Sequence, residues 1–289
     1  KPAMIIVQGD TTSAFAAGLT AFYENIPVGH VEAGLRTNNL LEPYPEELNR
    51  RLLSQLACLH FAPTKKAKQN LVDSGVLGSI LITGNTVIDA LKIITERLPD
   101  LSTFIDVEKL GEKRIILSTV HRRENWGNNL KNIAISLKEI LDKNPDTVLI
   151  LPMHVNPLVR DVLTNILGNH DRALLIEPLK YSELLSAMKA CEIIITDSGG
   201  IQEEAPSFKK PVLILRNSTE RQEVIDNNSA VLVGTDKENI LKNANTILNN
   251  KNIYRKMTEA NNPFGDGQSS KYILKECLKY LSKKINQFN

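Results

Sequence analysis

Three carboxylates stand where strand-like or helix-like segments begin or end near the start of the chain. Asp10 follows the apolar run MIIVQG, Glu32 follows PVGHV, and Glu46 lies at the start of a helix-like segment. Crowding of like charges raises the pKa of a carboxyl group toward neutrality, which suits a base that removes a weakly acidic C–H proton. We therefore expect Asp10, Glu32 and Glu46 to lie at one crevice rim and to move a proton at a carbon atom.

The stretch TDSGGIQEEA, residues 196–205, is typical of a phosphate-binding turn between a strand and a helix. Two glycines let backbone N–H groups approach a phosphate, and the helix N-terminus adds partial positive charge. We expect Ser198, Gly199 and Gly200 to form the turn, the helix to begin at Ile201, and one of the following glutamates to accept hydrogen bonds from a ribose. A plain capped helix after a tight turn explains the same residues. The pattern is neither G-x-G-x-x-G nor a Walker A loop, which disfavours nicotinamide and ATP folds.

Three further polar groups directly follow strand-like runs. His121 in HRRENWG can act as a general acid to a leaving phosphate, with neighbouring Arg122 or Arg123 supplying charge. Arg216 and Arg221 in RNSTER suit a loop around a phosphate or a base edge, and His154 in MHVNP has the same placement after a strand. Capping histidines, surface arginines and a solvated loop are the alternative interpretations.

A helix is predicted for PYPEELNRRLLSQL, with Pro45 near its first position. The helix dipole favours glutamates in the first turn. Ion pairs between these glutamates and arginines four residues later stabilise the helix further. The pairs expected are Glu46 with Arg50 and Glu47 with Arg51, and the buried face expected is Leu48, Leu52 and Leu56. This local account explains Glu47 and both arginines but leaves Glu32 without a structural role.

Strand-length apolar runs alternate with amphipathic segments along the whole chain; Leu130, Ile133, Leu137, Ile140 and Leu141 share one such helical face. This alternation predicts two doubly wound, Rossmann-like α/β domains with parallel sheets. The stretch LPDLSTFIDVEKLGEK breaks the rhythm. We expect a Rossmann-like N-terminal domain over 1–97, a Rossmann-like C-terminal domain over 98–268, and a terminal helix over 269–289. Only four strands are evident in the first domain, so we expect it to lack N-terminal βα units.

Composition excludes several classes of protein. The 289 residues carry a formal net charge of +2 with no block of like charge, so neither a nucleic-acid arm nor a polybasic membrane segment is indicated. The three cysteines form no C-x-x-C pattern, which supports neither a zinc site nor a disulfide framework. No apolar run reaches the ~18 residues of a spanning helix.

The combination of motifs resembles the non-hydrolysing UDP-N-acetylglucosamine 2-epimerases. The matching stretches run in family order from residue 7 to about 267 and include HVEAGLRT, PEELNR, HRREN, PMHVNP, SGGIQEEA, STER and NPFGDG. The resemblance implies a glycosyltransferase-B-like pair of Rossmann-like domains, with UDP bound by the C-terminal domain over 98–268 and the terminal helix crossing back to the first. It implies interconversion of UDP-GlcNAc and UDP-ManNAc by elimination and re-addition of UDP, with inversion at sugar carbon 2 and no metal or nicotinamide cofactor.

Residue roles follow from the same resemblance. The catalytic set implied is Asp10, Glu32, Glu46 and His121, and the substrate-binding set is Ser198, Gly199, Gly200, Glu204, Arg216 and Arg221. Arg122 and His154 match positions near a second UDP-GlcNAc that activates bacterial members. Two departures from the family pattern are Gln222 in place of a proline and Phe264 in place of a tyrosine.

The family also implies a cytoplasmic homodimer that supplies ManNAc units for cell-envelope polysaccharide. Two other interpretations fit the sequence: an inactive, truncated nucleotide-sugar-binding remnant, and a glycosyltransferase of similar architecture. A transferase has no need to deprotonate carbon 2, so the carboxylates around HVEAGLR speak against it. We expect the carboxylates of one domain and the glycine turn of the other to share one substrate.

Overall fold

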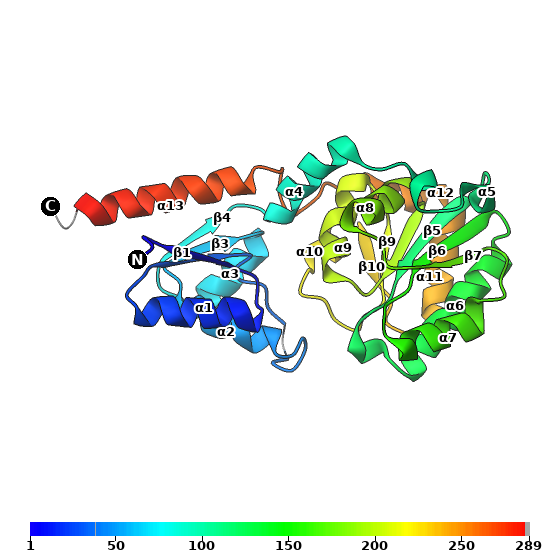
Figure 1. Cartoon of the computed structure of the whole chain (residues 1–289), viewed down its shortest axis with the longest axis horizontal. Coiled ribbons are helices and arrows are strands. Elements are labelled where there is room, and N and C mark those ends of the chain that lie inside the picture. Colours follow the sequence, from blue (N-terminus) through cyan, green and yellow to red (C-terminus); the bar gives the residue numbers. More distant parts are fainter. Residues whose placement is uncertain (38, 287–289) are drawn as a thin grey trace. The chain divides into compact units, whose positions relative to one another are not determined.

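The computed structural model describes residues 1–37 and 39–286 and divides into two compact units (Figure 1). Unit 1 holds Lys1–Lys92 together with the segment from Pro263 onward, and unit 2 holds Ile93–Asn262. The division falls a few residues before each boundary expected from the sequence. Both units are α/β structures built on parallel sheets, which confirms the predicted fold class.

Unit 1 contains a four-stranded sheet of order β1-β2-β3-β4 in which every neighbouring pair is parallel. Parallel neighbours require a crossover connection, and a helix follows each strand. The strands are β1 Ile5–Gln8, β2 Val28–Val31, β3 Leu59–Ala62 and β4 Ser79–Ile82, and the helices are α1 Thr12–Tyr23, α2 Glu46–Leu56, α3 Lys65–Asp73 and α4 Thr86–Ile94. Thr11 and Thr64 cap α1 and α3 by accepting hydrogen bonds from backbone N–H groups of the first turn.

The last helix, α13 (Ser269–Asn286), packs on the sheet of unit 1. Ile273 and Cys277 are buried in a cluster with Phe61 of β3 and neighbouring apolar residues. Asp89 of α4 accepts hydrogen bonds from the first two N–H groups of α13, at 3.0 and 2.8 Å. A carboxylate at a helix N-terminus accepts hydrogen bonds from N–H groups that lack a partner within the helix, and its negative charge interacts favourably with the helix dipole. Asp89 of α4 therefore caps α13 and fixes its start.

Unit 2 contains a six-stranded parallel sheet of order β10-β9-β8-β5-β6-β7. Its strands are β5 Arg114–Thr119, β6 Thr147–Pro152, β7 Ala173–Ile176, β8 Ile193–Thr196, β9 Val212–Ile214 and β10 Ala230–Leu232. Its α-helices are α5 Val107–Leu110, α6 Asn128–Lys143, α7 Pro157–Leu167, α8 Tyr181–Ala190, α9 Gly199–Glu204, α10 Glu223–Asp226, α11 Lys237–Asn249 and α12 Lys251–Thr258. Short 3₁₀ helices lie at Thr95–Arg97, Leu101–Thr103, Arg123–Asn125 and Ala205–Phe208.

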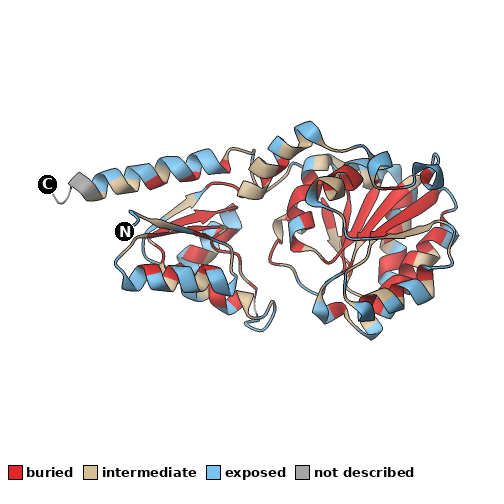
Figure 2. Ribbon diagram, viewed as in Figure 1, coloured by how far each residue is buried: buried red, intermediate tan, exposed pale blue. Residues whose placement is uncertain are grey.

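The core of unit 2 surrounds its central strands, whose residues are buried on both faces (Figure 2). Helix α6 contributes the apolar face predicted from the sequence, and all five of its members are buried: Leu130, Ile133, Leu137, Ile140 and Leu141. Continuous Val, Ile and Leu runs in β5, β6 and β8 therefore reflect strands covered on both sides. Among the described residues, no helix combines the length and apolarity needed to cross a bilayer.

Helix α2 corrects one prediction. Leu48 and Leu52 are more than two-fifths exposed, whereas the buried positions are Glu47, Asn49, Arg50, Leu53 and Ser54. The buried face is polar because it packs against groups that need hydrogen-bond partners, and apolar periodicity alone does not reveal those partners.

Candidate functional site

Unit 2 has a topological switch point at the carboxyl ends of β5 and β8. The chain runs from β5 outward to β6 and β7, then returns to place β8 on the other side of β5. Ligands of open parallel sheets bind at such a reversal. His121 follows β5 and Asp197 follows β8, so the switch point brings two of the sequence motifs together.

The phosphate-type motif differs from the prediction in one respect: helix α9 begins at Gly199, with Ser198 as its N-cap. Both glycines therefore lie in the first helical turn, and their N–H groups belong to the set that lacks an i−4 partner. A Cβ at Gly200 meets no atom within 4 Å, whereas a Cβ at Gly199 lies 2.7 Å from Nη1 of Arg221. The space beside Gly200 is therefore open. The lack of a side chain at Gly199 lets the guanidinium of Arg221 lie against the start of the helix.

The two glutamates of α9 have different surroundings. Glu203 is buried and pairs with Nε of Arg221 at 2.6 Å, so its charge is balanced within the protein. Glu204 accepts a hydrogen bond of 2.7 Å from the hydroxyl of Tyr181. Burial raises the pKa of Glu204 to about 7, against the hydrogen bond from Tyr181, which lowers it. Of the two glutamates, Glu204 is therefore the one whose ability to accept hydrogen bonds depends on pH near neutrality.

Arg216 and Arg221 are buried and paired with carboxylates. Arg216 lies 3.1 Å from Glu220 and 3.4 Å from Glu124, and Arg221 contacts both Glu203 and Glu220. These pairs fix the loop after β9 beside α9. Arg221 reaches the glycine turn through its contact with Gly199, whereas Arg216 acts within a buried ion network.

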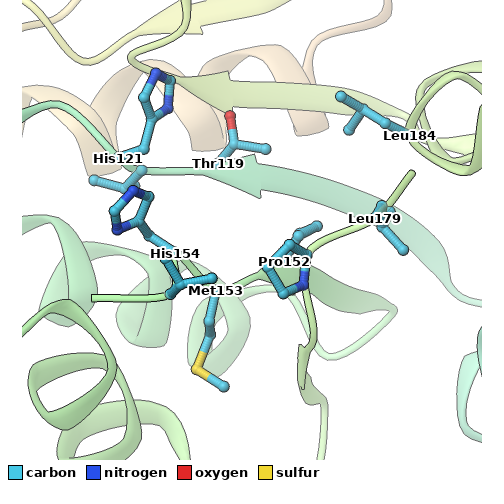
Figure 3. Close-up of a pocket in the computed structure, with 10 residues that line it drawn as sticks. Thr119, His121, Pro152, Met153, His154, Leu179 and Leu184 are labelled. Carbon is cyan, nitrogen blue, oxygen red and sulfur yellow. The ribbon is translucent and has the colours of Figure 1, made fainter. Parts of the chain in front are cut away.

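A cavity of about 250 Å³ opens at the ends of β5, β6 and β7. Its walls are mostly apolar and come from Thr119, Val120, His121, Pro152, Met153, His154, Val155, Pro178, Leu179 and Leu184. The rings of His121 and His154 lie on one side of it, and Leu179 and Leu184 lie on the other (Figure 3). The cavity therefore places a mostly apolar pocket next to His121.

Unit 1 brings Asp10 and Glu32 to the ends of adjacent strands. β1 and β2 pair in parallel with Gln8 opposite Val31, so the residues just beyond both strands share one sheet edge. Glu46 is the first residue of α2. The next turn of that helix reaches Asp10, because Asn49 donates to its carbonyl at 3.0 Å and Arg50 pairs with its carboxylate at 2.5 Å. The segments that carry Asp10, Glu32 and Glu46 therefore all lie at one edge of the sheet in unit 1.

Glu32 has a left-handed backbone, with φ of 63°. A side chain in that region is strained, and such strain is found at functional positions. Gly9 lies close by, since a Cβ built there would sit 3.4 Å from Oε2 of Glu32. His30, in contrast, is wholly buried and bonds to the carbonyl of Gly9 at 2.8 Å. Burial lowers the pKa of His30 to about 4, so it supports the turn as a neutral side chain.

Sequence reasoning missed several residues of these sites. The sequence predicts Arg50 as a partner of Glu46 on a helix surface, yet Arg50 is buried and pairs with Asp10 and Glu47. Tyr181 belongs to none of the sequence motifs. Its position shortly after β7 could have indicated that it lies near the ligand-binding edge of the sheet. The apolar lining of the cavity gave no signal, because Leu and Pro after a strand are common. Within residues 1–37 and 39–286, no group of three or more His, Cys, Asp or Glu is arranged to hold a metal ion.

The fold and sites define an α/β protein with two parallel sheets, a helix start without a side-chain cap at a switch point, and a carboxylate edge. The sequence model of the UDP-N-acetylglucosamine 2-epimerase family matches residues 1–278. The chain belongs to this family.

Known proteins share both sequence and structure with the chain. The UDP-N-acetylglucosamine 2-epimerase of Bacillus subtilis is 45% identical over 279 residues, which cover 96% of this chain and 73% of the relative. The solved complex of S. aureus MnaA with UDP superposes with a TM-score of 0.92 at 45% identity, covering 97% of this chain and 76% of that one. The Neisseria meningitidis UDP-GlcNAc 2-epimerase bound to UDP-GlcNAc gives a TM-score of 0.89 at 43% identity, covering 96% and 76%.

Proposed function

We propose that this protein is a UDP-GlcNAc 2-epimerase that interconverts UDP-GlcNAc and UDP-ManNAc. The observation that carries the proposal is the presence, in one chain of this family, of both a carboxylate edge in unit 1 and a helix start at a switch point in unit 2. The first suits removal of a proton from carbon, and the second suits a nucleoside diphosphate. Two relatives that bind UDP and UDP-GlcNAc support the choice of substrate.

The chemistry assigned to unit 2 is binding and departure of UDP. The phosphates lie at the start of α9, where Ser198, Gly199 and Gly200 offer N–H groups and helix polarity favours an anion. The ribose hydroxyls donate to Glu204. The uracil base fits the cavity lined by Leu179 and Leu184, which is of suitable size and largely apolar. His121 faces the leaving phosphate oxygen as its acid.

The chemistry assigned to unit 1 is proton transfer at carbon 2. One carboxylate removes the proton, the C1–O bond breaks with its electron pair going to UDP, and a C1=C2 double bond forms. UDP then re-adds to C1 while a carboxylic acid protonates C2 from the opposite face. Asp10, Glu32 and Glu46 provide the groups, and the reaction needs no net oxidation. Arg50 balances the charge of Asp10, so Glu32 and Glu46 are the stronger candidates for the proton shuttle.

Wider roles rest on the family resemblance. We extend the proposal to a homodimer, to a cytoplasmic location, and to supply of ManNAc units for cell-envelope polysaccharide. A second UDP-GlcNAc acts as activator near Arg122 and His154. His154 lines the cavity beside His121, which is consistent with a nucleotide close to the reacting one.

The test is incubation of the purified chain with UDP-GlcNAc in D₂O, followed by NMR of the sugar. The proposal predicts UDP-ManNAc that carries deuterium at carbon 2. Binding of UDP with no exchange would instead identify a nucleotide-sugar-binding remnant. Transfer of the sugar to an added acceptor, without deuterium at carbon 2, would identify a glycosyltransferase.

A further inference from the structure

Asp197 occupies the centre of the switch point in unit 2. Its side chain is buried, and its carboxylate accepts hydrogen bonds from the backbone N–H groups of His121 at 3.1 Å and Arg122 at 2.9 Å. Nδ2 of Asn125 donates to the same carboxylate at 3.0 Å, and Nδ1 of the His121 ring lies 3.0 Å from Oδ1. One carboxylate thus collects four groups of the loop after β5.

All four partners can be donors, which matches an ionised Asp197. Burial opposes ionisation, but the hydrogen bonds from His121, Arg122 and Asn125 outweigh it, so the pKa of Asp197 lies below its usual value. An ionised carboxylate can only accept hydrogen bonds. The proton of the Asp197–His121 contact therefore belongs to Nδ1 of the imidazole.

This assignment determines which ring nitrogen is reactive. Nδ1 is committed to Asp197, whose side chain has 0% exposure, while the His121 side chain is 46% exposed. Nε2 is consequently the nitrogen left to meet a ligand, and the ring itself lines the cavity.

We infer that Asp197 is a positioning residue that holds His121 as the Nδ1–H tautomer and presents Nε2 to the departing oxygen of UDP. This role rests on the proposed function. When the ring is protonated on both nitrogens, Nε2 gives its proton to the phosphate oxygen as the C1–O bond breaks. The neutral Nδ1–H tautomer remains, and its Nε2 recovers the proton when UDP adds back. Because Asp197 directly precedes Ser198 and α9, the residue that orients the acid also joins the turn that binds the phosphates.

A purely structural role for Asp197 needs to be distinguished, because the carboxylate also docks the loop. Asn125 offers the matched control. Its Nδ2 donates to Asp197 and to the carbonyl of Leu215 at 3.1 Å, so Asn125→Ala loosens the loop without removing the contact between Asp197 and the His121 ring.

The decisive experiment is nitrogen–proton correlation NMR of the histidine rings in the full ¹⁵N-labelled chain, with His121→Gln used for assignment. The wild-type protein is expected to show neutral His121 with its proton on Nδ1. Asp197→Asn should lose this preference and lower kcat on the order of 10²-fold, with a much smaller change in KM. Asn125→Ala should keep the tautomer.

A neutral His121 protonated on Nε2 in the wild-type protein would overturn the inference. Equal losses of kcat in Asp197→Asn and Asn125→Ala, with the tautomer unchanged in both, would also overturn it. If Asp197→Asn does not fold, the wild-type tautomer decides. The NMR result needs no turnover, so an Nδ1–H tautomer in a protein without exchange at carbon 2 would refute the proposed function, while the orientation of the His121 ring by Asp197 would stand.

Discussion

Arg50 and Asp10 form an ion pair in which Nη2 lies 2.5 Å from Oδ2. The guanidinium is only 4% exposed and also lies 3.2 Å from Glu47, whose side chain is fully buried. A buried cation thus joins the strand end that carries Asp10 to helix α2, which begins at Glu46. The carboxylate edge of unit 1 is organised by this arginine.

Arg50→Met should therefore destabilise unit 1 strongly. The change leaves Glu47 buried with a weakened set of partners, and breaking a buried pair costs about 3–5 kcal/mol. Arg51→Ala is the matched control, because Arg51 pairs with the same buried Glu47 but is itself 42% exposed, so that water can partly replace it and the loss of stability should be smaller. Denaturant unfolding followed by circular dichroism measures both. An Arg50→Met protein as stable as Arg51→Ala would refute this role.

Gly199 and Gly200 should respond differently to alanine. A Cβ at Gly199 lies 2.7 Å from the Arg221 guanidinium, so Gly199→Ala displaces that side chain at a cost of about 1–3 kcal/mol. Gly200→Ala meets nothing within 4 Å and should leave stability unchanged or raise it by up to about 1 kcal/mol, since alanine favours helix. Thermal unfolding measures stability, and calorimetric titration with UDP measures binding.

The two variants also test the phosphate site. Gly200→Ala places a methyl group where the phosphates are proposed to approach, so it should weaken UDP binding at least tenfold without loss of stability. If Gly200→Ala binds UDP with wild-type affinity, the phosphates do not bind at the start of α9.

Binding of UDP should weaken as the pH falls below about 7. The pKa of Glu204 is raised to about 7 by burial, and only its ionised form accepts hydrogen bonds from both ribose hydroxyls. Below that pH the carboxyl must lose a proton to bind, which costs affinity; above it the affinity is constant. Calorimetry across this range with Glu204→Gln as control separates this effect from titration of UDP itself. A wild-type pH profile that matches Glu204→Gln would exclude Glu204 as the ribose acceptor.

The backbone of Glu32 gives a prediction about strain. Its φ of 63° is unfavourable for a residue with a Cβ, by about 1–2 kcal/mol. Glu32→Gly should therefore be more stable than Glu32→Ala by about 1 kcal/mol, although both remove the carboxylate and should abolish exchange at carbon 2. Denaturant unfolding of the two variants provides the comparison. Greater stability of the alanine variant would show that the left-handed backbone carries no strain.

The alternation of apolar runs predicted the fold well because buried parallel strands leave a direct pattern in the sequence. RIILST is strand β5 at the predicted residues, and α6 buries its predicted face. Periodicity failed at α2 because the buried face there is formed by Glu47, Asn49 and Arg50. Their partners come from distant segments, and no local pattern reveals them.

The candidate site was predictable where residues directly follow strands, as with Asp10, His121 and Ser198. Glycines have low helix propensity, so the start of α9 was placed two residues late. The roles of Asp197 and Tyr181 depend on which strand neighbours which. The switch point that joins Asp197 to His121 arises from the order of β5 and β8, which sequence spacing does not specify.

The most direct test of the central claim compares deuterium exchange with UDP binding in the same variants. Proton transfer at carbon 2 is assigned to unit 1, and binding of UDP is assigned to unit 2. Glu32→Gln should therefore lose deuterium incorporation at carbon 2 of UDP-GlcNAc by on the order of 10²-fold or more, while it binds UDP with nearly wild-type affinity. Exchange at the wild-type rate in Glu32→Gln, or loss of UDP binding together with exchange, would contradict that division.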